Sequence, residues 1–151
     1  MEKIAVIALS FVAWTCHAEW SDIPMGTVVT NSDMIVIAVL TNVTQEASNS
    51  IIRCRGILKV KEVLKGPAEM NNLKLEWSFS VPPKSVTTDH TQSQGRPLLW
   101  LLKRCGQHTF EANYYKRVQG IEMKDDIKNI IERFLNKMPE SAIHQLVDPQ
   151  H

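Results

Sequence analysis

Large apolar side chains alternate with polar ones over residues 73–79, and this pattern constrains the fold more than any other. The apolar residues are Leu73, Leu75, Trp77 and Phe79, with Lys, Glu and Ser between them. A period of two residues places successive side chains on opposite faces of a β-strand. The segment therefore predicts a strand with one face against a core and the other against solvent.

Other segments also have the composition of strands. Residues 34–43 are rich in Ile and Val and predict a strand that is buried on both faces, followed by a polar turn over 42–50. The apolar run 98–102 is too short for an independent helix and predicts a central strand. A last strand is expected from the turn at Cys105 through about Tyr114.

Residues 51–64 predict one long strand with two different faces. Cys54, Leu58 and Val60 share one face, and Gly56 predicts a bulge or bend where the strand curls. The opposite face is basic except at Ile57. Its charged residues are Arg53, Arg55, Lys59 and Lys61, with Lys65 beyond the strand end.

From residue 122 the period becomes helical. Asp125 and Asp126 lie in the expected first turn and Arg133 near the end, which suits the helix dipole, and Pro139 stops the helix. One or two further helical turns are expected within residues 24–30. The apolar positions of the long helix are Met123, Ile127, Ile130, Ile131, Phe134, Leu135 and Met138.

Together these elements predict a mainly β protein. Five strands with short connections, taken as antiparallel, and one terminal amphipathic helix indicate a small five-stranded OB-like barrel. A lipocalin-like barrel would need more strands. We expect one domain over residues 19–138 and a loosely ordered tail over 139–151.

The first eighteen residues have the pattern of a secretory signal peptide. Lys3 precedes an apolar run over residues 4–14, and small residues surround a cleavage site near Ala18-Glu19. Removing residues 1–18 from 151 leaves 133, enough for one core. We therefore expect an exported protein, periplasmic or secreted.

The charge balance limits the classes of partner that we expect. A formal net charge of +1 does not favour long-range attraction to polyanions, so no nucleic-acid partner is expected. The mature part has no apolar run long enough for a membrane span. We expect a protein partner, a monomer or weak oligomer, and no cofactor.

Two cysteines follow the leader, Cys54 and Cys105. In an exported protein an even pair predicts one disulfide, while two buried free thiols are the alternative. Their spacing matches neither a redox C-x-x-C motif nor a zinc knuckle.

Three segments resemble a group of small exported bacterial proteins without assigned activity, over residues 30–120. These segments are Gly56–Gly66, which includes V-x-E-V-L-K-G, then Leu73–Trp77 with L-x-L-x-W, and Leu99–Leu102 with W-L-L. The group's acidic residue and His before a Gly are matched by Asp89-His90 and Gly95. Its later Tyr and Arg are matched by Tyr114 and Arg117, but Pro82-Pro83-Lys84 replaces its Cys-Pro-Arg.

The strand order and terminal helix are more remotely similar to netrin-like modules related to metalloprotease inhibitors. Those modules begin with a cysteine that contacts the target metal, whereas Glu19 stands at that place here. The resemblance thus implies an OB-like fold and export, and it does not carry over the inhibitory chemistry.

These patterns lead to three hypotheses. The first is a non-enzymatic protein-binding module, such as an inhibitor or an envelope accessory factor, with its contacts on the 82–96 loop at His90 and on Tyr114, Tyr115 and Arg117. The second is a small metal-dependent hydrolase using Asp89, His90 and His108, although Asp89 and His90 are adjacent and would point apart. The third is a binder of anionic oligosaccharide or nucleic acid. It would use the basic strand face of Arg53, Arg55, Lys59 and Lys61, which is ordinarily only a solvated surface.

Overall fold

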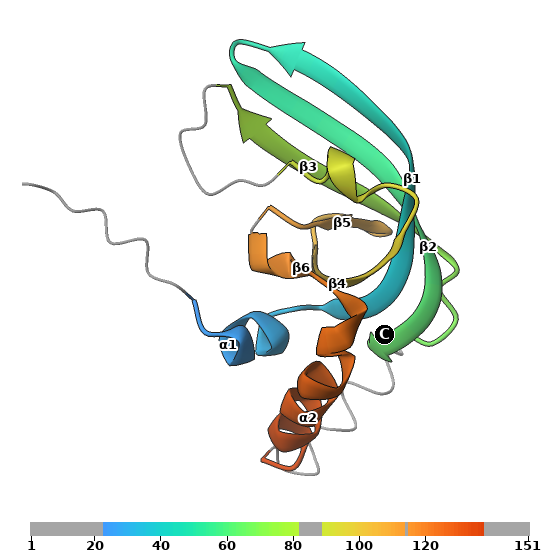
Figure 1. Cartoon of the computed structure of the whole chain (residues 1–151), viewed down its shortest axis with the longest axis vertical. Coiled ribbons are helices and arrows are strands. Elements are labelled where there is room, and N and C mark those ends of the chain that lie inside the picture. Colours follow the sequence, from blue (N-terminus) through green and yellow to red (C-terminus); the bar gives the residue numbers. More distant parts are fainter. Residues whose placement is uncertain (1–22, 82–88, 114, 138–151) are drawn as a thin grey trace, which may run out of the picture.

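The computed structural model describes residues 23–81, 89–113 and 115–137. The expected signal peptide, the tail and Tyr114 lie outside these residues. The chain forms a mainly β structure with a small helix at each end of the described sequence (Figure 1). Its elements are α1 (Met25–Thr30), β1 (Met34–Ser48), β2 (Ile51–Lys65), β3 (Asn72–Ser80), η1 (Thr91–Ser93), β4 (Pro97–Arg104), β5 (Thr109–Glu111), η2 (Tyr115–Arg117), β6 (Val118–Gln119), η3 (Ile121–Met123) and α2 (Lys124–Leu135).

Five of the strands form a closed ring. Their order is β1-β2-β3-β5-β4, and β4 pairs back onto β1 to complete an OB-like barrel. The predicted fold class is confirmed, but the expectation that every pair is antiparallel is wrong. β3 and β5 are parallel, with Leu75 opposite Phe110. A ring with an odd number of strands cannot alternate in direction throughout, so closure requires at least one parallel pair. The short strand β6 adds to β4 as a sixth strand.

Bulges curl the two longest strands around the barrel. Thr41 pairs with Ile57 and Thr44 with Arg55, so two residues of β1 oppose the single residue Gly56. A Cβ at Gly56 would lie 2.6 Å from Cδ1 of Leu40, which explains why a glycine is needed at this close approach. The bend expected at Gly56 is confirmed, with the extra residue on β1.

The barrel interior is filled by side chains from all five strands of the ring. Its largest fully buried members include Trp100, Phe110, Leu58 and Leu75, each 0% exposed. The four alternating residues that predicted β3 face this interior, although Phe79, near the strand end, is only partly buried. Interior side chains thus occupy the barrel as a packed core.

A second apolar cluster lies outside the barrel and explains the continuous apolar run of β4. Leu99 and Leu101 face away from the interior, and together with Ile35 they pack against α1 and against Ile127 and Ile131 of α2. The two helices lie at one end of the structure (Figure 1). β4 is therefore buried on both faces, by the barrel core on one side and by helices on the other.

Two predicted boundaries are wrong. The polar residues expected as a turn over 42–50 instead continue β1 to Ser48, and only Asn49 and Ser50 form the turn. Both turn residues have positive φ, 48° and 65°, the backbone twist that a two-residue hairpin loop requires. The last strand expected through Tyr114 ends earlier, because β5 covers only Thr109–Glu111.

The predicted disulfide is also wrong, since both Cys54 and Cys105 are free thiols. Cys54 points into the barrel opposite Trp77 and is 1% exposed. Cys105 is exposed in the β4–β5 turn, which packs beside Lys74 through a 3.3 Å hydrogen bond from the Lys74 N–H to the carbonyl of His108. One thiol is inside the barrel and the other outside it, so their side chains do not approach in bonding geometry. Within the described residues, no helix combines the length and apolar character that crossing a membrane would need.

Candidate binding surface

The outer surface of β2 and β3 gathers exposed cations. The alternation along β2 turns Arg53, Arg55 and Lys59 to the outside, and Lys61, the extra residue of a bulge, is exposed as well. Lys74 of β3 is exposed and pairs in register with Ile57, which places a fifth cation on this surface. We call these five residues, Arg53, Arg55, Lys59, Lys61 and Lys74, the basic face.

Two carboxylates lie among these cations. Glu76 of β3 is opposite Arg55, with 3.6 Å between Oε1 and the guanidinium Nε. Glu46 of β1 is opposite Arg53. Beside them, Thr44, Gln45, Glu46, Arg53 and Arg55 line a shallow hollow of about 230 Å³. An exposed ion pair of this kind contributes little to stability, so both arginines remain accessible to a partner's carboxylates.

The outer surface of β2 and β3 carries no aromatic side chain among the described residues. Trp77 and Phe79 alternate with the outward-facing residues of β3 and point to the interior. Proteins that bind single-stranded nucleic acid combine cations with exposed aromatic rings on which bases stack. The basic face provides the charges without the stacking rings.

His90 does not lie on a surface. Its side chain is enclosed at the barrel interior and the residue is 1% exposed. The ring meets Trp77 and Trp100 edge-on, with centroids 5.7 and 5.5 Å away, and Nε2 is 2.5 Å from the carbonyl oxygen of Ala112. Burial lowers the pKa of His90, although the Ala112 bond and the charge of Asp89 partly oppose this effect. The imidazole is a buried core group that cannot contact a partner in this conformation.

The other candidate metal ligands are separated from His90. Asp89 folds back on its own loop, where it accepts hydrogen bonds from the backbone N–H of Thr91, at 2.9 Å, and from the Thr91 hydroxyl. His108 is exposed in the β4–β5 turn. In the parts of the chain that the structure describes, no three His, Cys, Asp or Glu side chains are grouped to hold a metal ion. The proposed triad is therefore not assembled.

The second predicted contact region, Tyr114, Tyr115 and Arg117, does not form one exposed surface among the described residues. Tyr114 lies outside the described residues, and Tyr115 begins η2. Arg117 is committed to the interior of the fold, because its Nη1 donates to Ser32 Oγ at 3.1 Å and to the carbonyl of Leu101 at 3.0 Å. Its side chain therefore connects η2 to β4 and to the segment after α1 by hydrogen bonds.

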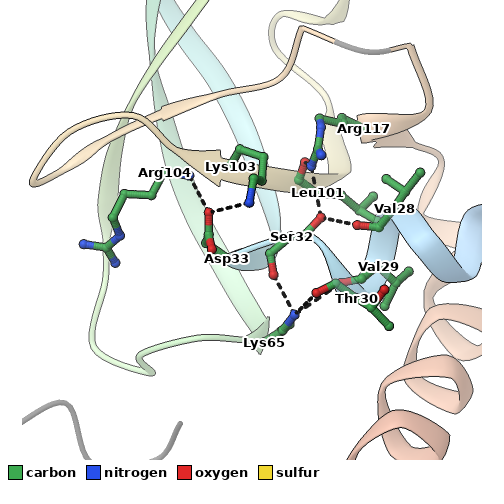
Figure 2. A network of polar contacts seen from close by, with 10 residues as sticks. All are labelled: Val28, Val29, Thr30, Ser32, Asp33, Lys65, Leu101, Lys103, Arg104 and Arg117. Atoms are coloured by element: carbon green, nitrogen blue, oxygen red, sulfur yellow. Dashed lines mark hydrogen bonds and ion pairs between the residues drawn. The ribbon is translucent and has the colours of Figure 1, made fainter. Parts of the chain in front are cut away.

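A polar network fastens α1 to the barrel (Figure 2). The Lys65 ammonium donates to the carbonyls of Val29, Thr30 and Ser32 at 3.2, 3.2 and 2.6 Å. These carbonyls lie at the C-terminal end of α1, where backbone acceptors lack helical partners and a cation is favourable. Desolvation by burial lowers the pKa of Lys65. Lys65 therefore belongs to this network, and its ammonium is not available to the basic face.

Asp33 completes the same network from the start of β1. Its carboxylate accepts the backbone N–H of Arg104 at 2.8 Å and lies 3.5 Å from the ammonium of Lys103. Burial alone would raise the pKa of Asp33, but the Arg104 hydrogen bond and the Lys103 charge lower it on balance. The sequence marked residues 31–33 only as a turn, because the residues that meet there are distant along the chain.

An apolar groove of about 620 Å³ adjoins this network. The end of β2, the end of α1 and the α2 residues Ile131, Phe134 and Leu135 line it, and the Lys65 ammonium lies 5.8 Å from the ring centroid of Phe134. Since Lys65 already donates to three carbonyls, its contribution here is to hold the walls of the groove together.

Searches of family models and of curated proteins gave no match to this chain. Assignment to a class therefore stops at the fold, an OB-like barrel with a C-terminal helix and a basic outer surface.

Proposed function

We propose that this protein is an exported, non-enzymatic module that binds an acidic protein through its basic face. The observation that carries the proposal is the concentration of five exposed cations on two paired strands, with two carboxylates among them. The chain as a whole has a formal net charge of only +1, so this concentration is local and does not follow from a basic composition.

The rigidity of the surface supports a recognition role. β2 is paired along its length with β1 and from Ile51 to Lys59 with β3, and its bulges fix the curvature of the sheet. Charges on a paired strand keep a constant spacing. A partner must therefore match both the positions and the sign of these charges. With a net charge of only +1, attraction is short-ranged and should weaken as salt rises.

Export rests on the leader pattern of residues 1–18, and the protein would act in the periplasm or outside the cell after cleavage near Ala18-Glu19. The anionic-polymer hypothesis uses the same cations. A protein partner is the better supported choice, because the basic face lacks stacking rings and lies beside Glu46 and Glu76, which would repel a phosphate backbone.

The test is capture of partners from the exported fraction on immobilised protein. Reversing Arg53 and Lys59 to Glu should abolish capture of the specific partner, because both substitutions place negative charge where its carboxylates bind. The matched control reverses Arg133 and Lys137, which are exposed on or just after α2, and should leave capture unchanged.

Two results would contradict the proposal. One is equal capture by the wild-type protein and the Arg53/Lys59 variant. The other is a combination of two observations: no protein is captured, and the wild-type protein binds heparin or a thymidine oligonucleotide but the Arg53/Lys59 variant does not. That combination would favour an anionic polymer as the ligand.

A further inference from the structure

Among the described residues, no strand covers one edge of the end of β1. β4 covers the edge of β1 only from Met34 to Val39, and the last backbone bond on that side among the described residues runs from the N–H of Gly95 to the carbonyl of Leu40, at 3.1 Å. From Thr44 to Ser48, β1 is exposed and its backbone pairs in the described structure with β2 alone, while the Gln45 side chain donates to Thr91 Oγ1 at 3.0 Å. Figure 1 shows this hairpin projecting past the barrel.

The segment has few of the features that usually block a free edge. Natural proteins protect such edges with lysine, proline or inward-pointing charge. Residues 44–48 read Thr-Gln-Glu-Ala-Ser, without lysine or proline, and the one charge, Glu46, shares the outward face of its pair Arg53. The edge can therefore accept another strand.

We infer that the open edge of β1 pairs with the same edge of a second copy, antiparallel and related by a two-fold axis at Gln45. The charges select this register. An axis at Glu46 would place the two Glu46 carboxylates directly opposite each other, which is destabilising. An axis at Thr44 would bring the second strand against the segment that Gly95 already occupies beside Leu40.

The register at Gln45 is complementary on both faces. On the outside, Glu46 of the second copy lies opposite Thr44, whose neighbour on β2 is Arg55. Strands are about 4.8 Å apart, so a long arginine side chain can reach over the short threonine to that carboxylate. Because of the two-fold symmetry, this row of Arg55, Thr44 and the second copy's Glu46 occurs twice in the dimer. On the inside, the partly buried Val43 lies opposite Ala47 of the second copy, an apolar pair.

The pairing has a consequence for recognition. It joins β3, β2 and β1 of each copy into one continuous sheet and places both basic faces on the same side of it. Two binding surfaces fixed together increase the apparent affinity for a partner with two acidic sites. The pairing itself does not depend on the proposed function, since it follows from the edge and from its own charges.

The test is sedimentation velocity of the purified protein over about a hundredfold range of concentration. A short strand interface buries little area, so we expect a monomer–dimer equilibrium that shifts with concentration. Glu46→Arg places a cation between Arg55 and Arg53 of the two copies and should weaken the dimer about tenfold. Adding Arg55→Glu to that variant restores opposite charges between position 55 of one copy and position 46 of the other, and should recover dimerisation.

Glu69→Arg is the matched control, because Glu69 is exposed in the β2–β3 loop and the change in charge is identical. It should dimerise like the wild-type protein, and circular dichroism should show that every variant is folded. A protein that stays monomeric at all concentrations would overturn the inference. So would equal effects of Glu46→Arg and Glu69→Arg, or a double variant that recovers nothing.

Discussion

Replacing Trp100 by alanine should lower the free energy of unfolding by about 3–5 kcal/mol. Trp100 is 0% exposed at the centre of the barrel core, and its indole Nε1 donates to the carbonyl of Ala38 across the β1–β4 pair, at 3.1 Å. The change leaves a large cavity and removes the indole hydrogen bond at the seam that closes the ring. Since a domain of this size is stabilised by about 5–15 kcal/mol, much of the protein should unfold at moderate denaturant.

Urea denaturation followed by circular dichroism measures this effect. Trp100→Phe keeps most of the apolar volume and should cost clearly less than the alanine change, which separates packing from the hydrogen bond. A loss below about 1 kcal/mol for Trp100→Ala would contradict the tightly packed interior.

Acid should destabilise the wild-type protein through His90, beginning as the pH falls below 6.5, the ordinary pKa of the group. Burial lowers the folded-state pKa, so the unfolded chain binds the proton more readily than the folded chain in this range. The stability from neutral His90 is therefore complete above pH 6.5 and is lost progressively as the pH falls toward the folded-state pKa. Among the described residues, the charge of Asp89 favours the protonated imidazole, but it opposes the effect of burial only in part. The Asp89 carboxylate accepts its hydrogen bonds from Thr91 and not from His90. The Cys54 thiol has its pKa raised, first by burial.

Unfolding free energies measured from pH 7 down to pH 5 test this expectation. His90→Gln, which can keep a neutral donor near Ala112, should remove most of the slope, whereas His90→Ala should cost about 2–3 kcal/mol at neutral pH. The carboxylates of Asp33 and Glu62, whose pKa values are lowered, contribute their own losses at more acidic pH. Equal slopes for the wild-type protein and His90→Gln would contradict the role of His90.

Local pattern predicted most of the strands because burial and period coincide in them. The period of two over residues 73–79 and the helical period after 122 both describe elements with one buried face. The apolar run of β4 was correctly interpreted as a central strand, and the structure supplies the reason, a helical layer outside the barrel. The parallel β3–β5 pair was missed, although five strands in a closed ring demand at least one parallel pair.

The candidate site was predictable only where it follows from strand alternation. The outward position of Arg53, Arg55 and Lys59 follows directly from the period of β2. In contrast, the interior position of His90, the hydrogen bonds of Arg117 and the commitment of Lys65 to α1 depend on contacts between distant segments. A single sequence contains no periodic signal for such contacts. Lys65 lies an even number of residues after Lys59 and Lys61 along β2, so the strand alternation offered no reason to separate it from the basic face.

Closure of the strand ring decides which side of β2 is outside the barrel, and backbone NOEs between amide and α protons test this closure most directly. The structure predicts antiparallel cross-strand contacts around Val36 and Trp100, and parallel contacts around Leu75 and Phe110. A spectrum that shows the β1–β2–β3 contacts but neither of these two sets would contradict the barrel and its closed interior.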